Sequence, residues 1–264
     1  MAASVPVLLY HHVCHDREVT PAGFSAQLDF LASRGWRTTT LAELADHLSG
    51  RRACPPRSVM LTFDDGYLDN WVHAFPELLR RKMSAVFFVV TDKISDAPEA
   101  RRPRADEGGA LADTLTDERG SGGFMNWAEL SEMAASGCAE VGSHTRSHRG
   151  FIRGAAWDLP KELEASKREL EMRLGRPCTA LAWPWGDEHP AWRATARQAG
   201  YSSAFGARPG PNSFPGDPLG IFRTKIRENS LDRLRRKLWL HSGPWISKAY
   251  GALHGLGAGL RGKA

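Results

Sequence analysis

The chain has 264 residues, 42% hydrophobic and 25% charged, a composition that is typical of a globular protein with a substantial core and that excludes a disordered chain. The formal net charge of +5 comes from basic residues that are scattered along the sequence, so we predict no nucleic acid partner. No apolar run approaches the length of a membrane span, which leaves peripheral contact with a membrane surface as the closest association with lipid.

The N-terminal residues and the cysteines indicate the cellular compartment of the protein and the redox state of its thiols. Residues 1–6 lack the basic segment and the long apolar core of a signal peptide, so we expect a cytoplasmic protein. The four cysteines are far apart and form no Cys-x-x-Cys pair, which indicates reduced thiols and neither a disulfide framework nor a zinc knuckle. The sequence carries no pattern that indicates an oligomeric state.

Segments with the periodicity of strands and helices alternate along the chain. Apolar or β-prone runs predict strands at residues 6–10, 36–40, 57–63, 85–90, 139–142, 179–183, 201–205 and 221–226. Apolar residues at helical spacing predict helices at residues 24–31, 41–48, 67–82, 127–135, 160–174, 190–199 and 231–239. This alternation, without a break in composition, predicts one α/β domain whose mostly parallel sheet is closed or nearly closed into a barrel.

The predicted domain covers residues 1–243. Within it, residues 95–123 are polar, charged and rich in glycine, which predicts an excursion over the surface. Residues 244–264 form a C-terminal tail that we expect to fray, although its basic residues leave contact with a membrane surface open.

Two adjacent carboxylates, Asp64 and Asp65, follow the strand at 57–63 and precede Gly66. Neighbouring side chains of a strand point to opposite faces, so both carboxylates reach one site only if the chain turns, which glycine permits. Two anions this close repel each other unless a cation lies between them or one of them holds a proton. The same three residues are also compatible with a turn that caps the following helix.

His144 and His148 are four residues apart in a polar stretch after the strand at 139–142. Imidazoles at this spacing can meet on one side of a helical turn and bind one metal ion, although the pattern alone is often incidental. Together with one carboxylate of the aspartate pair they would supply three protein ligands and leave an open position for water. This arrangement is typical of hydrolytic metal sites.

The turn Trp183-Pro184-Trp185-Gly186 follows the strand at 179–183. Proline and glycine favour a rigid turn, and the flat apolar face of an indole stacks well on a sugar ring. We therefore predict that Trp183, Pro184, Trp185 and Gly186 contact a sugar, while either indole alone is equally compatible with a place in the core.

These motifs resemble those of the polysaccharide deacetylases, carbohydrate esterase family 4, over residues 7 to about 238. Thr62–Gly66 matches the first family motif residue for residue, and Ser143–His148 matches the second with the same spacing. The segment Tyr10-His11 and the helix that contains Phe24 and Gln27 resemble the branch with poly-N-acetylglucosamine deacetylases and other exopolysaccharide-modifying members. The resemblance implies a distorted, TIM-like (β/α) barrel of about seven strands.

By this resemblance, Asp65, His144 and His148 bind a divalent metal ion, with zinc (Zn²⁺) expected first and cobalt, nickel or manganese also suited to such ligands. Asp64 would be the general base for a metal-activated water that attacks an amide carbonyl, and the N–H of Trp185 would help to stabilise the oxyanion. The implied enzyme is a hydrolase of carbon–nitrogen bonds that removes N-acetyl groups from a sugar in an oligosaccharide, a polysaccharide or a lipid-linked glycan.

The sequence departs from the family pattern in three places. The third motif lacks the arginine that pairs with the catalytic aspartate, and Arg223 or Lys225 is the candidate to replace it. The fourth motif, an Asp-Trp pair, is not visible. The fifth motif, Leu-x-His, has no clear match, so the general acid is open between His11, His241 after the last predicted helix, and Asp64 itself.

Two other functions remain compatible with the sequence. The same fold could hydrolyse a small cyclic amide or ureide, which the missing signal peptide favours. The chain could also be a carbohydrate-binding protein whose catalysis has lapsed, although it retains the three metal ligands and the base.

Overall fold

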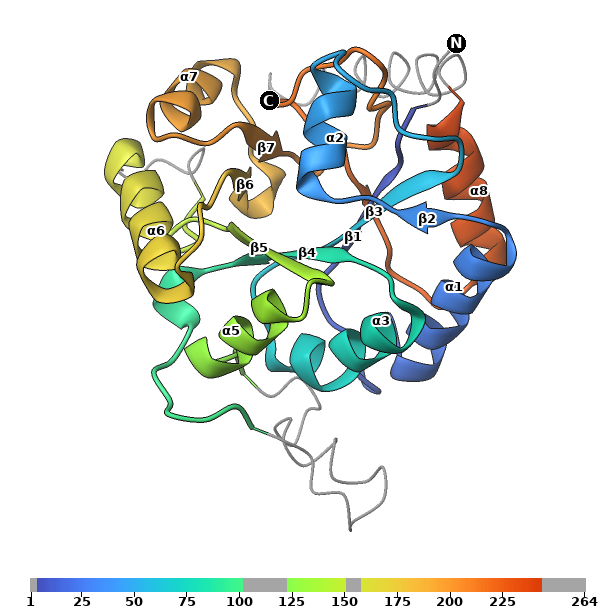
Figure 1. Ribbon diagram of the computed structural model, residues 1–264, viewed down its shortest axis with the longest axis horizontal. Helices are drawn as coiled ribbons and strands as arrows, with labels where there is room; N and C mark the ends of the chain where they lie inside the picture. The colour runs from blue at the N-terminus through green and yellow to red at the C-terminus, as the bar shows by residue number, and fades with distance from the viewer. Residues whose placement is uncertain (1–3, 102–122, 151–157, 244–264) are drawn as a thin grey trace, which may run out of the picture.

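The computed structural model describes residues 4–101, 123–150 and 158–243, and a curved sheet of parallel strands lies at its centre (Figure 1). The strand order is β7-β6-β5-β4-β3-β1-β8, and β2 pairs with β3 outside this path. Every pairing between these strands is parallel. The strands are β1 (Val7–Tyr10), β2 (Arg37–Thr38), β3 (Ser58–Phe63), β4 (Ala85–Val89), β5 (Ala139–Ser143), β6 (Ala180–Ala182), β7 (Ser203–Phe205) and β8 (Thr224–Lys225).

Ile221, three residues before β8, connects the two ends of this strand order. It forms a parallel bridge with Phe205 of β7. Its N–H donates to the carbonyl of Ala204 at 2.9 Å, and its own carbonyl accepts from the N–H of Gly206 at 2.9 Å. The sheet is thereby almost closed, which confirms the distorted (β/α) barrel of about seven strands.

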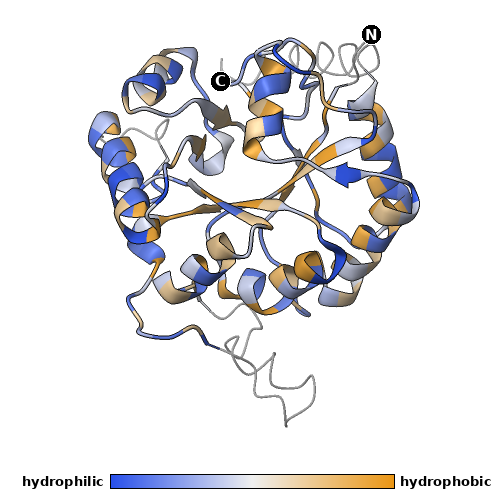
Figure 2. Ribbon diagram, viewed as in Figure 1, coloured by the Kyte–Doolittle hydropathy of each residue, from blue (hydrophilic) through white to orange (hydrophobic). Residues whose placement is uncertain are grey.

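Helices alternate with the strands, and α8, α1, α3, α5 and α6 follow one another around the outer face of the sheet (Figure 1). Their hydrophobic sides and the hydrophobic strands face each other, while hydrophilic residues face outward (Figure 2). The helices are α1 (Pro21–Ser33), α2 (Leu41–Leu48), α3 (Phe75–Arg81), α5 (Trp127–Ala135), α6 (Leu159–Leu174), α7 (Pro190–Gln198) and α8 (Leu231–Ser242), with short helical turns η1 (Asn70–Ala74), η2 (Thr91–Lys93) and η3 (Pro184–Gly186).

Two predicted helices differ from those observed. The helix expected at 67–82 begins as the π-helical turn η1 and continues as α3. Pro76, in the first turn of α3, has no N–H to donate, so a regular hydrogen-bond ladder cannot run through this position. The last helix, α8, extends to Ser242, so His241 lies inside the helix and not after it.

The side chains of the central strands divide the core into two layers. Outside the barrel, Phe63 of β3 stacks on Phe87 of β4 with ring centroids 4.8 Å apart, and both belong to the larger cluster beneath the helices. Inside the barrel, Met60 of β3 and Phe88 of β4 belong to a smaller cluster. Asp64 is an even number of residues from Met60, so its side chain points to the barrel interior as well.

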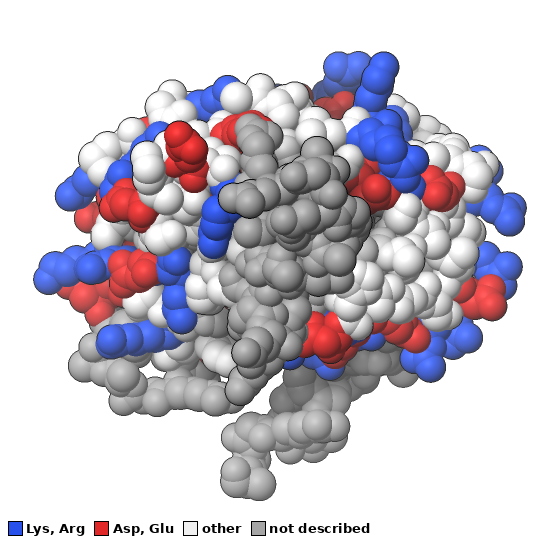
Figure 3. All heavy atoms as spheres, turned by 90° about the horizontal axis from the view of Figure 1, so that it is seen from below, with Lys and Arg blue, Asp and Glu red and all other residues white. Residues whose placement is uncertain are grey.

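The surface charges are mixed and the cysteines are free, as the sequence led us to expect. Basic and acidic side chains are interspersed on the face shown in Figure 3. All four cysteines are free, as expected. No helix in the described part of the chain is long and apolar enough to cross a membrane. Most of the predicted excursion at 95–123 and all of the tail at 244–264 lie outside the described residues, so the division of the chain into domain, excursion and tail stays a prediction.

Candidate active site

A cavity of about 620 Å³ opens at the carboxyl ends of the strands. His11 follows β1, Asp64 and Asp65 follow β3, and His144 and His148 follow β5, and all five residues line this cavity. Parallel strands end at the same edge of a sheet, which is why residues far apart in the sequence meet here.

The aspartate pair reaches the cavity because the chain turns over two consecutive residues. Asp65 has φ 75° and Gly66 has φ 83°, both in the left-handed region. Glycine adopts this conformation readily, whereas for an aspartate it costs about 1 kcal/mol or more. A Cβ atom on Gly66 would also lie 3.0 Å from the side chain of Val89, so the turn needs glycine for space as well as for conformation.

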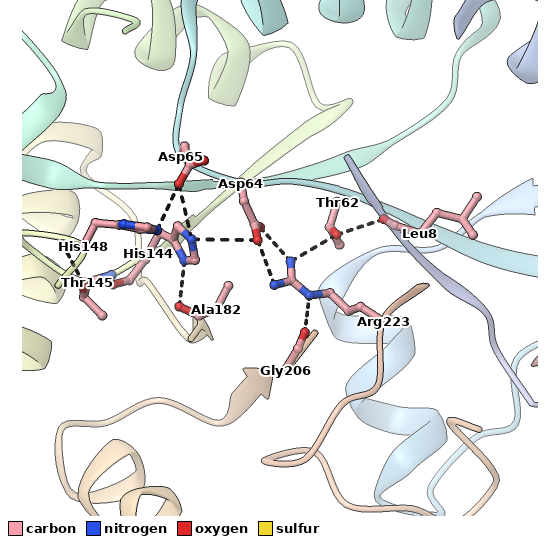
Figure 4. A network of polar contacts seen from close by, with 11 residues as sticks. Leu8, Thr62, Asp64, Asp65, His144, Thr145, His148, Ala182, Gly206 and Arg223 are labelled. Atoms are coloured by element: carbon pink, nitrogen blue, oxygen red, sulfur yellow. Dashed lines mark hydrogen bonds and ion pairs between the residues drawn. The ribbon is translucent and has the colours of Figure 1, made fainter. Parts of the chain in front are cut away.

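Asp64 does not cap a helix; its carboxylate is bound by Arg223 (Figure 4). Nη1 of Arg223 donates to Oδ1 at 2.6 Å, and Nη2 donates to Oδ2 at 2.8 Å. Both side chains are almost fully buried, with exposed fractions of 4% for Asp64 and 0% for Arg223. This two-point ion pair occupies the place that the missing third-motif arginine left open, whereas Lys225 forms no ion pair with Asp64 among the described residues.

Arg223 makes two further hydrogen bonds. Its Nε donates to the carbonyl of Gly206 at 2.6 Å, and Nη1 also donates to the hydroxyl of Thr62 at 3.3 Å. The guanidinium lies over the rings of Phe88 and Phe205, with distances of 5.5 and 6.0 Å to the ring centroids. Arg223 is therefore held in one orientation by hydrogen bonds and aromatic contacts.

The charge of Asp64 depends on its partners. Burial opposes ionisation, but the Arg223 guanidinium and, after it, His144 outweigh this effect and lower the pKa of Asp64 to about 2. The carboxylate is therefore ionised throughout the neutral range.

Asp65, His144 and His148 place three metal-binding atoms close together. Oδ1 of Asp65 lies 3.5 Å from Nε2 of His144 and 3.2 Å from Nε2 of His148. Atoms that share one tetrahedral zinc ion are about 3.3 Å apart, because each ligand bond is about 2.0–2.2 Å long. These residues therefore fit a divalent metal ion.

The tautomer of His144 supports this fit. Its Nδ1 lies 2.9 Å from the carbonyl of Ala182, which can only accept, so Nδ1 donates to this carbonyl and Nε2 is the nitrogen that faces Asp65. Burial and, after it, the neighbouring His144 lower the pKa of His148 to about 4, so the imidazole of His148 is neutral near pH 7. A neutral imidazole is the form that binds a metal ion.

Two residues that the sequence did not single out, His12 and Asp69, form a second polar pair beside the cavity. Nδ1 of His12 lies 2.5 Å from Oδ2 of the fully buried Asp69, and the imidazole stacks on Tyr67 with ring centroids 3.7 Å apart. Cys14 lies close enough to complete a set of three metal-binding groups. The two atoms of the His12–Asp69 pair are at hydrogen-bond distance, and the Sγ of Cys14 donates to Oδ1 of Asp16 at 3.2 Å, so all three groups already have hydrogen-bond partners within the protein.

The two tryptophans of the predicted sugar-binding turn have different places. Trp185 is 63% exposed, lines the cavity and lies beside His148, with ring centroids 5.3 Å apart. Trp183 is fully buried and packs against Trp192, so its predicted sugar contact is wrong because the indole belongs to the core. Gly186 lines the cavity, and Pro184 is buried behind it.

Of the two histidines that are candidates for the general acid, His11 lies in the cavity and His241 does not. His11 lines the cavity, and the charges of Asp64, Asp65 and His144 act on it. Burial, as the largest effect, lowers its pKa. His241 is buried in α8 and is not among the residues that line the cavity.

Comparison with known proteins identifies the family. Residues 51–204, more than half of the chain, match the polysaccharide deacetylase family model. The chain therefore belongs to the polysaccharide deacetylase family, as its motifs led us to expect. The predicted enzyme class, a hydrolase of carbon–nitrogen bonds, is confirmed at the level of this family.

Two curated proteins and one solved structure illustrate the relationship. YxkH of Bacillus subtilis (strain 168) is 24% identical over 226 residues, which are 85% of this chain and 72% of that protein. The poly-beta-1,6-N-acetyl-D-glucosamine N-deacetylase of Escherichia coli (strain K12) is 30% identical over 142 residues, which are 53% of this chain but 20% of that protein. The structure of IcaB from Ammonifex degensii aligns with a TM-score of 0.73 and 27% identity over 90% of this chain and 97% of that one.

We predict that removing the guanidinium of Arg223 destabilises the protein strongly. Arg223→Met leaves the buried charge of Asp64 unpaired and should lower the free energy of unfolding in urea by about 3–5 kcal/mol, whereas Arg223→Met combined with Asp64→Asn should lower it by less.

The ion pair should also make stability depend on pH. Because the folded pKa of Asp64 lies below the ordinary value of 3.8, the stabilisation is present above that pH and should be lost as the pH falls toward about 2.

Arg51 provides a matched control for this prediction. It forms an ion pair with Asp46 at 2.6 Å, but its side chain is 67% exposed. Arg51→Met should therefore change the free energy of unfolding by less than about 1 kcal/mol. An equally small effect of Arg223→Met would contradict the assigned role of the buried pair.

We also predict that Trp183 contributes to stability and that Trp185 contributes to ligand contact. Trp183→Ala should lower the free energy of unfolding by about 3–5 kcal/mol because it empties a core position. Trp185→Ala should change it by less than about 0.5 kcal/mol, since the indole is exposed. Urea unfolding of both variants measures the change in stability. Calorimetry measures the binding of N-acetylglucosamine oligomers to Trp185→Ala. Unimpaired oligomer binding by Trp185→Ala would contradict a sugar contact at this indole.

Proposed function

We propose that this protein is a metal-dependent N-deacetylase that removes acetyl groups from an N-acetylated sugar in an oligosaccharide, a polysaccharide or a lipid-linked glycan. The observation that carries the proposal is the separation of two adjacent carboxylates within one cavity. Asp65 faces the two histidines, and Asp64 is bound by Arg223. Neighbouring residues of the same type are thereby given two different chemical tasks.

Asp65, His144 and His148 are the proposed metal ligands, and zinc is the first candidate. A divalent ion held there supplies Lewis acidity, which makes a water molecule acidic near neutral pH and polarises an amide carbonyl. The hydrogen bond from His144 to the carbonyl of Ala182 keeps the imidazole oriented with Nε2 toward Asp65.

Asp64 is the proposed general base. Its low pKa keeps the carboxylate unprotonated, and the two hydrogen bonds from Arg223 fix its orientation toward the cavity. Each carboxylate oxygen has a second lone pair, so one of them can accept the proton of the attacking water. Arg223 then stabilises the site against movement of the carboxylate while the proton is transferred.

The remaining steps use residues on either side of the ligands. We assign the backbone N–H of Trp185 as a donor to the developing oxyanion, in a turn fixed by the hydrogen bond from the N–H of Gly186 to the carbonyl of Trp183 at 3.0 Å. His11 is the proposed group that delivers a proton to the leaving amine, because it lines the same cavity and lies within the electrostatic reach of Asp64 and Asp65. Since burial lowers its pKa, His11 would first take up the proton that Asp64 accepts from the attacking water.

The sugar is proposed from two observations. The exposed indole of Trp185 offers a flat apolar surface beside His148. The matching Escherichia coli protein is named for its action on poly-beta-1,6-N-acetyl-D-glucosamine, and this chain resembles 20% of its length. N-acetylglucosamine units are therefore the first substrates to test.

The first test is release of acetate from N-acetylglucosamine oligomers by the zinc-loaded protein. We expect acetate and free amine in equal amounts, and we expect chelation of the metal to stop the reaction and added zinc to restore it. A protein that turns over a cyclic amide or ureide but no N-acetylated sugar would contradict the proposed substrate. Binding of oligomers with no turnover of any amide would favour a lapsed, carbohydrate-binding protein.

The second test distinguishes the role of Asp64 as general base from the role of His144 as metal ligand. Asp64→Asn should retain zinc, measured by elemental analysis, and lose activity by about 10²–10⁴-fold, the contribution typical of a general base. His144→Ala should lose both zinc and activity because the ion loses one of three protein ligands. Full activity of Asp64→Asn, or loss of its zinc, would show that the two roles are assigned wrongly.

A further inference from the structure

The wall of the catalytic cavity carries more basic than acidic side chains. Apart from the aspartate pair, Glu18 is the acidic residue among the described residues that line it. Asp64 is already neutralised by Arg223, and Asp65 faces the proposed cation. The basic residues that line the cavity are Arg17, Lys93, Lys225 and Arg227.

These cations come from different segments of the cavity wall. Lys225 is the last residue of β8 and lines the cavity, and the charges that act on it include those of Arg227, Asp64 and Glu18. In η2, the ammonium group of Lys93 lies 4.9 Å from the ring centroid of Phe124, and both residues line the cavity. A ligand that occupies this cavity therefore lies near positively charged groups.

Lys225 is the cation best placed to bind a ligand. Its side chain is half-buried, and its ammonium group has neither a hydrogen bond nor an ion pair within the described ranges. Burial and, after it, the charge of Arg227 lower the pKa of Lys225, so the charged form is disfavoured by its surroundings. A bound anion would relieve both effects, because it would replace lost hydration and offset the neighbouring guanidinium.

The carboxylate of Glu18 does not neutralise the positive charge of Lys225 and Arg227. Oε1 of Glu18 lies 4.0 Å from Nε of Arg227, and each of these side chains is 63% exposed. An ion pair of this length at the surface is weak, so both groups remain available to a ligand. Basic residues therefore outnumber the carboxylate of Glu18 beside the aspartate pair, which favours an anionic group in the ligand.

This charge does not match a neutral polymer of N-acetylglucosamine. Such a chain has no anionic group for these cations to bind. Each deacetylation also leaves an ammonium group on the product, which Lys225 and Arg227 would repel. The charge does match a sugar that bears phosphate or carboxylate groups.

We propose that the substrate is an N-acetylated glycan with an anionic group, a phosphate or a carboxylate, near the acetylated sugar, and that Lys225 and Arg227 bind this group. The proposal rests on the proposed deacetylase function and specifies its substrate class. Lysine supplies a compact charge with three donors, and the exposed guanidinium of Arg227 can add two parallel donors to the same anion.

The test compares acetate release from three kinds of substrate. The first is a neutral N-acetylglucosamine oligomer, the second an oligosaccharide of alternating N-acetylglucosamine and glucuronic acid, and the third N-acetylglucosamine 1-phosphate. At low salt we expect kcat/KM for at least one anionic substrate to exceed that for the neutral oligomer about tenfold or more, as charge-assisted hydrogen bonds would produce. The advantage should shrink at about 0.5 M salt, where exposed charges are screened.

Substitution of Lys225 separates binding from chemistry. Lys225→Met should raise KM for the preferred anionic substrate about tenfold, leave kcat nearly unchanged and hardly affect the neutral oligomer, while Lys225→Arg should recover part of the loss. Lys161→Met is the matched control, since Lys161 on α6 is 83% exposed and outside the cavity, and its kinetics should equal those of the unsubstituted protein.

The outcomes are distinguishable. Preference for the phosphate or for the carboxylate substrate identifies which anion the cavity takes. Equal turnover of neutral and anionic substrates, together with unchanged kinetics of Lys225→Met, would overturn the proposed substrate class and leave the deacetylase function intact. Failure to release acetate from any N-acetylated sugar would instead overturn the proposed function; binding of the anionic sugars to Asp64→Asn, with and without Lys225→Met, would then decide the role of Lys225.

Discussion

The ion pair between Asp64 and Arg223 is the interaction on which the proposed chemistry depends. Two carboxylates that are adjacent in sequence and both directed to one cavity repel each other unless each has a cation. Arg223 supplies one of these cations from within the protein, and the ligand set of Asp65, His144 and His148 fits the other. The pair also has a structural consequence, because a buried carboxylate without its guanidinium would cost several kcal/mol of the folding free energy.

The barrel fold is what makes this pair possible. Arg223 and Asp64 are 159 positions apart in the sequence, and they meet because β8, which follows Arg223, pairs with β1 beside β3, while Ile221 bridges to Phe205 and nearly closes the sheet. The same closure places the guanidinium over the rings of Phe88 and Phe205. The apolar interior of the barrel therefore supports the polar end of the cavity, and the left-handed turn at Asp65 and Gly66 directs Asp64 to Arg223 and Asp65 to the two histidines.

The sequence predicted most of the fold and the centre of the site, because these depend on local patterns. Apolar runs and short motifs located the strands and brought Asp64, Asp65, His144 and His148 to one edge of the sheet. Properties that depend on long-range packing were less accessible: Arg223 was one of two candidates, Trp183 was placed on a sugar although it is buried, and the His12–Asp69 pair was missed. The π-helical turn η1 was missed as well, although Pro76 was a local signal for it.

The division of labour between the two aspartates is tested most directly by a crystal structure of the zinc-loaded protein with anomalous diffraction measured at the zinc edge. The account predicts one zinc ion bound by Nε2 of His144, Nε2 of His148 and the carboxylate of Asp65, with Asp64 still bound by both terminal nitrogens of Arg223. A zinc ion bound by Asp64, or an Arg223 that has moved to Asp65, would contradict the account.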